Sequence, residues 1–261
     1  ADQEGFGYCQ LTVRKARRNS TAAAYLDPVR YRKNLTIMTN AQATRVLLDG
    51  KRAVGVEYDR GGTRMEARAR AEVLLSGGSV NSPQLLELSG IGDPGVLNEF
   101  GIQTAHALPG VGANLQDHFI TRQTWYIQNA ESVNQRTRGL SLAWEVAKYF
   151  YKGEGVLALS VANVVGFAKV REGVETPDIQ YHMTPASFDN TPQRNLEAFP
   201  GMTIAPCQLR PLSRGTIHIK SSEPLAAPAI RPNFLDDQVD LDTIVGGMML
   251  GRKIMEAPPM D

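Results

Sequence analysis

The sequence is poor in the residues from which disulfide frameworks and metal sites are built. Its 261 residues include two cysteines, Cys9 and Cys207, and four histidines. Two cysteines so far apart form neither a disulfide framework nor a CxxC redox or metal motif. The histidines show none of the HxxxH or HxxE spacings of zinc hydrolases. We therefore predict no metal site.

The chain also lacks an excess of charge of either sign and a long apolar run. Lysine and arginine total 28 against 27 acidic residues, a formal net charge of +1, so there is no global basic field for nucleic acid. No apolar run approaches the roughly 20 residues of a membrane-spanning helix. With 42% hydrophobic and 21% charged residues, the chain reads as globular. We expect it to be cytoplasmic or peripherally membrane-associated, without a nucleic-acid partner.

The first part of the chain is rich in strand signals. Strands are expected at residues 35–39, 45–48, 53–58 and 65–75. Asp49-Gly50 suits a type I′ hairpin turn between the second and third strands. The fourth strand ends in Val73-Leu74-Leu75, which is typical of a buried parallel strand. Ser76-Gly77-Gly78 then either lets a ligand approach the backbone closely or supplies only the φ freedom of a turn, and spacing leaves both readings open.

Helix signals and further strand signals follow. Four helices are expected at residues 82–90, 93–101, 140–153 and 237–258, and four later strands at residues 161–170, 179–183, 202–209 and 215–221. Ser82 and Pro83 suit the first turn of the first helix, and Gly90 suits its end. Residues 140–151 carry an apolar stripe at helical spacing, of the kind that normally faces a core. The polar residues 129–139 are expected to be a flexible connection. The order predicts an α+β chain in two parts.

Two motif matches carry little information on their own. Residues 90–95 fit GxGxxG, but a dinucleotide loop leaves a strand and opens a helix, whereas this one follows a predicted helix. We therefore do not interpret it as a nucleotide site. Residues 209–215 form a basic turn, in which Arg210 either faces solvent or clamps an anion or a carboxylate.

The histidines do not form a recognisable catalytic pattern. His118 follows Asp117, but neighbours in an extended chain point in opposite directions, which argues against an orienter–base pair. No GxSxG nucleophile elbow is present for a hydrolase. His182 and His218 lie within expected strands, with His218 on the solvent-facing side. The pattern assigns a catalytic role to neither.

The segment that carries most information is residues 78–92, which read GSVNSPQLLELSGIG. This segment resembles, without a gap, the second signature of the glucose–methanol–choline (GMC) flavin oxidoreductases. The flanking residues resemble the choline-dehydrogenase branch of that family at residues 3–7, 18–26, 34–37, 49–58, 108–118 and 213–215. The resemblance extends over essentially the whole chain.

The resemblance implies a division into domains. Residues 1–125 correspond to the C-terminal part of an FAD-binding domain, with a β-meander and the signature, and residues 126–261 to an antiparallel-sheet substrate domain with helices. Family members are about twice as long. Their N-terminal GxGxxG and their C-terminal catalytic histidine block have no counterpart here. We therefore expect a middle fragment without catalytic residues of its own, inactive in isolation, with weak or absent FAD binding.

The resemblance also implies site residues. Ala43 would offer its backbone to the adenine of FAD, and Ser76, Gly77 and Gly78 would lie near the adenosine end. Asn163 and Arg210 are the expected substrate contacts. Choline-specific relatives carry a glutamate on the strand that here spans residues 161–167, and no acid stands there. A desolvated cation without a carboxylate is poorly held, so a neutral primary alcohol is expected rather than choline.

The full-length protein is thus expected to oxidise a primary alcohol to an aldehyde by hydride transfer to flavin, with an undetermined electron acceptor. An alternative is a non-enzymatic ligand-binding module that lacks the flavin machinery. If Val73–Leu75 belongs to a sheet whose other strands are missing, unpaired edges would favour oligomers or marginal stability.

Overall fold

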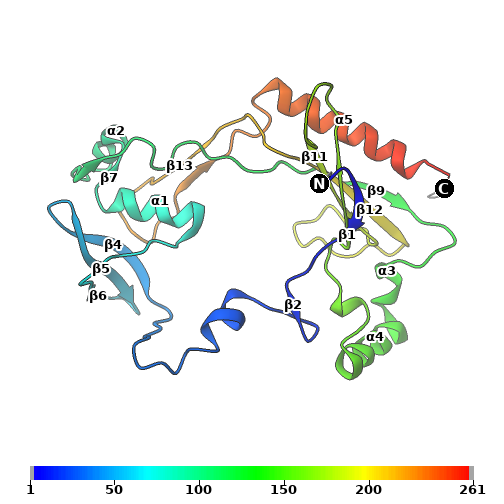
Figure 1. Cartoon of the computed structure of the whole chain (residues 1–261), viewed down its shortest axis with the longest axis horizontal. Coiled ribbons are helices and arrows are strands. Elements are labelled where there is room, and N and C mark those ends of the chain that lie inside the picture. Colours follow the sequence, from blue (N-terminus) through cyan, green and yellow to red (C-terminus); the bar gives the residue numbers. More distant parts are fainter. Residues whose placement is uncertain (1–2, 259–261) are drawn as a thin grey trace. The chain divides into compact units, whose positions relative to one another are not determined.

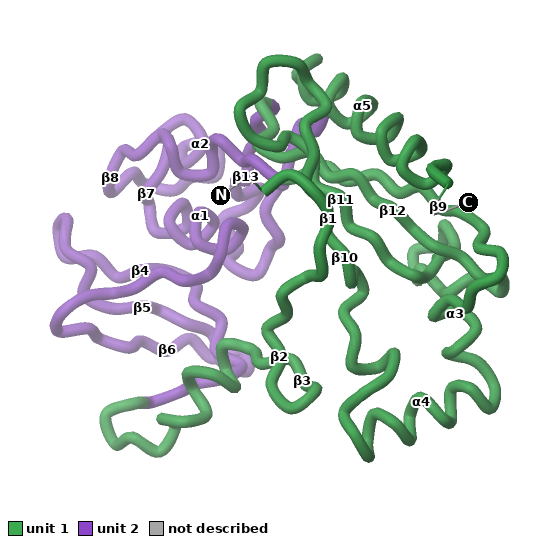
Figure 2. Tube along the Cα trace, turned by 45° about the vertical axis from the view of Figure 1, so that its right-hand side comes forward, with its two compact units in different colours: residues 1–35, 118–212, 237–261 green, residues 36–117, 213–236 purple. Residues whose placement is uncertain are grey.

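Figure 1 shows the computed structural model of the chain, which describes residues 3–258. It forms two compact units, which Figure 2 distinguishes by colour: unit 1 comprises residues 1–35, 118–212 and 237–261, and unit 2 comprises residues 36–117 and 213–236. The predicted division at residues 125/126 uses two consecutive segments, whereas these units are interleaved. The difference arises because residues 213–236 return to the first part, where Gly215 pairs with Leu115.

Unit 2 combines a three-stranded antiparallel sheet with two helices and two small ladders. Its elements are β4 (Gln42–Asp49), β5 (Arg52–Arg60), β6 (Thr63–Arg68), α1 (Gly78–Leu88), β7 (Ile91–Gly92), α2 (Pro94–Glu99), β8 (His106–Ala107), β13 (Thr216–His218) and β14 (Ala229–Arg231). The sheet order is β4-β5-β6, and β13 pairs with β14. The predicted meander is therefore confirmed, but the strand expected at residues 215–221 belongs to unit 2 and not to the larger sheet.

The turn between β4 and β5 differs by one residue from the prediction. Asp49 pairs with Arg52, so the two-residue loop is Gly50-Lys51. Gly50 has a positive φ of 57° and Lys51 does not, whereas a type I′ turn needs positive φ at both central residues.

Two helix boundaries of unit 2 lie where the sequence predicts them, namely the start of α2 and the end of α1. Asp93 caps α2 by accepting a hydrogen bond from the Gly95 amide at 2.7 Å. Gly90 follows α1 with φ 78°, and a Cβ there would lie 2.5 Å from the Gln103 carbonyl oxygen, so this position requires glycine. The start of α1 was predicted four residues too late. Pro83 lies inside the helix, where it lacks the amide that its turn would otherwise use.

One predicted strand and the end of another are absent. Residues 35–39 lie outside any strand, and the strand predicted at residues 65–75 ends at Arg68 as β6, so that residues 73–75 also lie outside any strand, with Leu74 77% exposed. The interpretation of Val73–Leu75 as a buried parallel strand is therefore wrong for the part of the chain that the structure describes. An apolar run becomes a strand only where another strand completes its ladder, and here none does.

Unit 1 is built around a five-stranded antiparallel sheet of order β1-β10-β11-β12-β9. Its elements are β1 (Gly5–Tyr8), β2 (Val13–Arg14), β3 (Arg17–Arg18), η1 (Ala22–Leu26), β9 (Gln123–Tyr126), α3 (Val133–Arg136), α4 (Gly139–Lys152), η2 (Val156–Ala158), β10 (Val164–Ala168), β11 (Ile179–Thr184), β12 (Gly201–Gln208) and α5 (Gln238–Met255). The strands predicted at residues 161–170, 179–183 and 202–209 are confirmed. Together the two units make the α+β fold that the sequence predicts.

Helix α5 covers one face of this sheet. The Tyr181 hydroxyl donates to the Gly247 carbonyl at 2.8 Å, and Ile179, Tyr181 and Ile204 are fully buried. Because side chains alternate along a strand, Gln180 and His182 point to the opposite face. Asp237 caps α5 by accepting from the Val239 amide at 2.8 Å, as expected. The predicted end at Pro258-Pro259 lies partly outside the described residues.

The polar segment 129–139 is ordered rather than a flexible connection. It contains α3, whose first amides are satisfied because the Ser132 amide donates to Oε1 of Gln135 at 2.8 Å. Asn134 is fully buried. Its Nδ2 donates to the carbonyls of Ser187 and Glu197, both at 3.0 Å. A polar sequence is thus held by partners more than 50 residues away.

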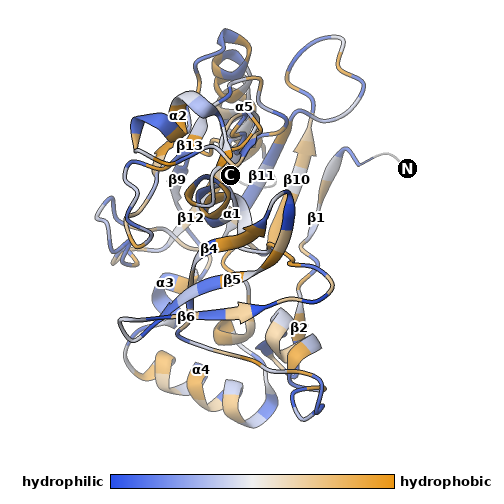
Figure 3. Ribbon diagram, turned by 90° about the vertical axis from the view of Figure 1, so that its left-hand side faces the viewer, coloured by the Kyte–Doolittle hydropathy of each residue, from blue (hydrophilic) through white to orange (hydrophobic). Residues whose placement is uncertain are grey.

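Helix α4 spans Gly139–Lys152, within one residue of the predicted range 140–153, but its apolar stripe faces solvent rather than a core. Gly153 ends it with φ 69°. Its apolar stripe is exposed, and its one buried residue is Glu145. Figure 3 shows the largely hydrophobic colouring of this ribbon. Within residues 3–258, no helix combines the length and apolar character needed to cross a bilayer.

Candidate functional site

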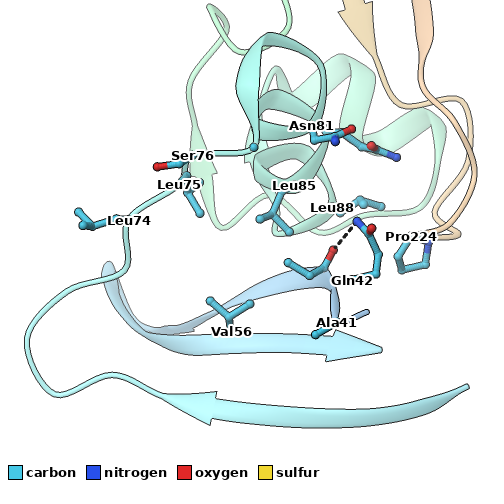
Figure 4. Close-up of a pocket in the computed structure, with 13 residues that line it drawn as sticks. Ala41, Gln42, Val56, Leu74, Leu75, Ser76, Asn81, Leu85, Leu88 and Pro224 are labelled. Atoms are coloured by element: carbon cyan, nitrogen blue, oxygen red, sulfur yellow. Dashed lines mark hydrogen bonds between the residues drawn. The ribbon is translucent and has the colours of Figure 1, made fainter. Parts of the chain in front are cut away.

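A pocket of about 260 Å³ lies between α1 and the strands β4 and β5. Figure 4 shows Leu85 of α1 pointing toward the strand that carries Val56, Leu88 on the side of Gln42 and Pro224, and Asn81 near the start of the helix. The full lining is Ala41, Gln42, Ala43, Val56, Leu74, Leu75, Ser76, Gly77, Asn81, Gln84, Leu85, Leu88 and Pro224. All of these residues belong to unit 2.

Three of the four predicted cofactor residues meet at this pocket. Ala43 comes from β4, and Ser76 and Gly77 come from the extended segment before α1. Gly78 is the first residue of α1, with φ 78°, and lies outside the lining. Residues more than 30 positions apart in the sequence are thus brought to one cavity.

The lining contains no charged side chain. Its polar side chains are three amides, Gln42, Asn81 and Gln84, and the hydroxyl of Ser76. Such a set can hold a flat, uncharged heterocycle by apolar contact and a few hydrogen bonds. It offers neither an acid–base pair nor a nucleophile. The chemistry of the lining therefore indicates binding rather than catalysis.

The backbone of β4 adds donors and acceptors, because β4 is an edge strand. Its amide at Val46 donates to Oγ of Ser89 at 2.8 Å on the side facing α1. The ladder to β5 is irregular between Ala43 and Arg45, as at a β-bulge. The carbonyl of Ala43 accepts a 3.3 Å hydrogen bond from Nε2 of Gln42, drawn as a dashed line in Figure 4. A ligand in the pocket would meet this stretch of edge backbone.

A buried carboxylate outside the lining ties the helix of the pocket, α1, to the segment around β13. Glu87 of α1 is fully buried, accepts from the Ile219 amide at 2.8 Å, and lies 2.6 Å from Nδ1 of His218. His218 lies on the more exposed side of its strand, as expected, since Ile217 and Ile219 are buried while its own side chain keeps 23% exposure, but its contact with Glu87 was not foreseen. The available signal was an acid inside the run Leu85-Leu86-Glu87-Leu88, since a charge among leucines requires a buried partner.

The predicted substrate residues do not come together. Asn163 uses its backbone, donating to the Met183 carbonyl at 3.1 Å and accepting from the Cys9 amide at 2.9 Å. Arg210 is exposed, and its guanidinium donates to Oγ1 of Thr176 at 2.6 Å. The register pairs Val164 with Met183, but Ile179 with Gln208. Asn163 and Arg210 therefore lie at opposite ends of these strands.

His182 of β11 is half-buried, and its pKa is shifted. Burial lowers its pKa, and the His118 imidazole lowers it further. A neutral imidazole is thus favoured on the sheet face opposite α5. His118 also has interactions of its own. Sequence reasoning did not bring these two residues together, because neither lies in a motif.

Comparison with known proteins decides the family. Sequence profiles described as GMC oxidoreductase match residues 1–120 and residues 211–261. The chain belongs to the GMC oxidoreductase family. The GMC signature at residues 78–92 corresponds to α1 and β7, so the most family-specific segment of the chain forms one wall of the pocket.

The curated GMC relatives include choline and alcohol dehydrogenases. The chain is 38% identical to the oxygen-dependent choline dehydrogenase of Pseudomonas savastanoi pv. phaseolicola, over 99% of the chain and 46% of that protein. It is also 38% identical to an alcohol dehydrogenase [acceptor] of Pseudomonas putida, over 100% of the chain and 48% of that protein. The chain thus spans about half the length of the curated relatives it matches.

Solved structures share the fold. An FAD-dependent oxidoreductase from Chaetomium thermophilum matches with a TM-score of 0.85 at 23% identity, covering 99% of this chain and 51% of that one. Pyridoxine 4-oxidase from Mesorbium loti matches with a TM-score of 0.80 at 24% identity, covering 98% of this chain and 47% of that one. At such identities the likeness concerns the fold alone.

Proposed function

We propose that the protein containing this chain oxidises a primary alcohol to an aldehyde with FAD as the hydride acceptor. The observation that carries the proposal is the uncharged pocket at Ala43, Ser76 and Gly77 in a chain of the GMC family. Apolar walls, amide side chains and edge backbone suit the adenine and ribose of FAD. When bound, FAD supplies the hydride chemistry. The residues of this chain bind and orient its adenosine end.

The proposed division of labour follows the family. Residues 1–125 would belong to the FAD-binding domain and residues 126–261 to the substrate domain. Asn163 and Arg210 are proposed substrate contacts. Because they lie at opposite ends of the strands, a small alcohol reaches only one of them. We favour Asn163, since a neutral amide can accept from or donate to a neutral hydroxyl.

A neutral alcohol is the proposed substrate. Holding a quaternary ammonium away from water requires a carboxylate or an aromatic cage. The segment from Val161 to Phe167 carries no acid. We therefore propose a neutral alcohol, rather than the choline named for several relatives, as the substrate.

For the 261-residue chain alone we propose no alcohol oxidation and weak or absent FAD binding. The pocket described here would hold only the adenosine end, and no catalytic base is assigned within the chain. Association through sheet edges is proposed as well, because β4 and β6 are both edge strands of their sheet. We place the protein in the cytoplasm or at the membrane periphery.

The visible spectrum of the purified intact protein, together with alcohol-dependent dye reduction, tests the activity. We expect a flavin spectrum and reduction of the dye by a primary alcohol. Ser76→Phe would fill the mouth of the pocket and lower the FAD content at least tenfold. Thr63→Phe, at an exposed position on β6 of the same unit, is the matched control and should keep the flavin.

Two results would overturn the proposal. An intact protein without flavin that still binds small ligands would be a binding module rather than an oxidoreductase. A Ser76→Phe variant with unchanged flavin content would show that the pocket does not hold the adenosine end, even if the activity itself is present.

A further inference from the structure

The apolar stripe of α4 faces away from the body of unit 1. Leu140 is 91% exposed, Tyr151 90%, Phe150 75% and Trp144 64%. An amphipathic helix normally buries such a stripe. Trp144, Phe150 and Tyr151 line one hollow, and with Leu140 they expose an apolar surface of the kind that marks an interaction site.

Polar contacts on the other side of α4 fix this orientation. The buried carboxylate of Glu145 accepts from the Val156 amide at 2.9 Å and from Nζ of Lys148 at 3.0 Å. The hydroxyl of Tyr149 donates to the Ala16 carbonyl at 3.2 Å. Turning the stripe inward would leave these groups without their partners. These contacts therefore stabilise the orientation of α4 in which the apolar stripe faces outward.

Basic side chains border the stripe. Nζ of Lys148 lies 5.7 Å from the centre of the Trp144 ring. Lys15 and Arg17, from the β2–β3 hairpin, line a hollow of about 320 Å³ together with Phe150 and Lys152. The hollow along the stripe itself, of about 470 Å³, is lined by one acid, Glu154. Cations thus outnumber anions around these apolar side chains.

We propose that this α4 face, formed by Leu140, Trp144, Phe150 and Tyr151 with Lys15, Arg17, Lys148 and Lys152, rests on an anionic lipid surface. Tryptophan and tyrosine favour the boundary between headgroups and acyl chains, and lysine stems reach along apolar surface toward phosphates. An amphipathic helix with these properties lies in the interface plane. The inference does not depend on the proposed activity.

The charges favour lipid over a second copy of the chain. A two-fold contact places the same patch on both partners. Here it would bring Lys148 and Lys152 close to their own counterparts, and like charges at an interface cost affinity. Lysine is also depleted from the cores of protein interfaces. An anionic headgroup layer instead complements Lys15, Arg17 and Lys152, while Lys148 is already paired with Glu145 at 3.0 Å.

Vesicle co-sedimentation of the intact protein tests the inference. We expect binding to phosphatidylcholine vesicles that contain phosphatidylglycerol, weaker binding to phosphatidylcholine alone, and a decrease as salt is raised. Lys15→Gln with Lys152→Gln should weaken partitioning roughly twenty-five-fold, at about fivefold per charge near such a surface. Trp144→Ser with Tyr151→Ser should weaken it at least tenfold. Met249→Ser, on the exposed side of α5, is the control and should bind like the wild type.

Several outcomes would overturn it. One is wild-type protein that stays in the supernatant with anionic vesicles. Another is equal binding by all variants whose circular dichroism shows them folded. A dimer, seen by light scattering, that the Trp144 and Tyr151 changes dissociate would assign the face to a second copy. A Tyr151→Cys variant that resists maleimide without lipid would show that another part of the protein covers the stripe.

Discussion

Nδ1 of His218 lies 2.6 Å from Oε1 of the fully buried Glu87, and this contact ties α1 to β13 inside unit 2. The same carboxylate accepts from the amide of Ile219. The helix that forms one wall of the pocket is therefore positioned by a strand more than 120 residues further along the chain. The pocket depends on that link as much as on its own lining.

Replacing Glu87 with alanine should lower the free energy of unfolding by about 3 kcal/mol, because His218 and the Ile219 amide would each lose a buried hydrogen-bond partner. Urea unfolding followed by fluorescence measures the change. Glu66→Ala, at an exposed position on β6, should cost less than about 0.5 kcal/mol. Equal losses in the two variants would contradict a structural role for the buried carboxylate.

Asn134→Ala should be similarly costly. Nδ2 of Asn134 donates to Ser187 and Glu197, and its Oδ1 accepts from the Ser187 amide at 3.0 Å. Removing the amide leaves several buried groups unpaired, at about 2–4 kcal/mol in total. Hydrogen exchange of the Ser187 amide should rise with the loss. Gln128→Ala, on the exposed surface nearby, should leave it unchanged.

Gly247→Val should disrupt the packing of α5 on the sheet. A Cβ at this position would lie 2.8 Å from Cδ1 of Ile179 and 3.2 Å from Cβ of Pro206, and the sheet residues there are buried. Overpacking of this kind costs about 1–3 kcal/mol. Thermal unfolding should show a lower Tm. A Tm equal to that of the wild type would mean that α5 can move away from β11 without loss.

His182 should make stability depend on pH near neutrality. Burial lowers its pKa in the folded state below the ordinary value of 6.5. As pH falls below about 6.5, the unfolded chain takes up the proton first, so folding becomes less favourable until the lower folded pKa is passed. Urea midpoints measured at decreasing pH should fall more steeply for the wild type than for His182→Gln. Parallel pH profiles would contradict this.

The sequence predicted those helix boundaries that are set by a single capping residue. Asp93, Asp237, Gly90 and Gly153 each mark a helix end as expected, because capping is a contact between near neighbours. The pocket residues were named from the family resemblance rather than from spacing. Their meeting at one cavity is a property of the fold.

The failures have a common cause, which is dependence on distant partners. Val73–Leu75 has the composition of a strand but no neighbouring strand in the described chain. The apolar stripe of α4 has the period of a helix. However, Glu145 and Tyr149 form hydrogen bonds with the backbone of Val156 and Ala16, so the polar side of the helix faces unit 1 and the stripe faces solvent. Asn134 and Glu87 look like ordinary polar residues until their partners at Ser187 and His218 are known. Periodicity specifies a face but not its direction.

The exchange of segments between the two units has a practical consequence for cutting the gene. A clone that stops at residue 125 would cut β9 before its last residue, Tyr126, and would remove its pairing partner β12. It would also discard β13 and β14 from unit 2. Neither half should be recovered in soluble form when expressed separately. Exchanging one unit with that of a homologue therefore requires four junctions in the same gene, at residues 35/36, 117/118, 212/213 and 236/237.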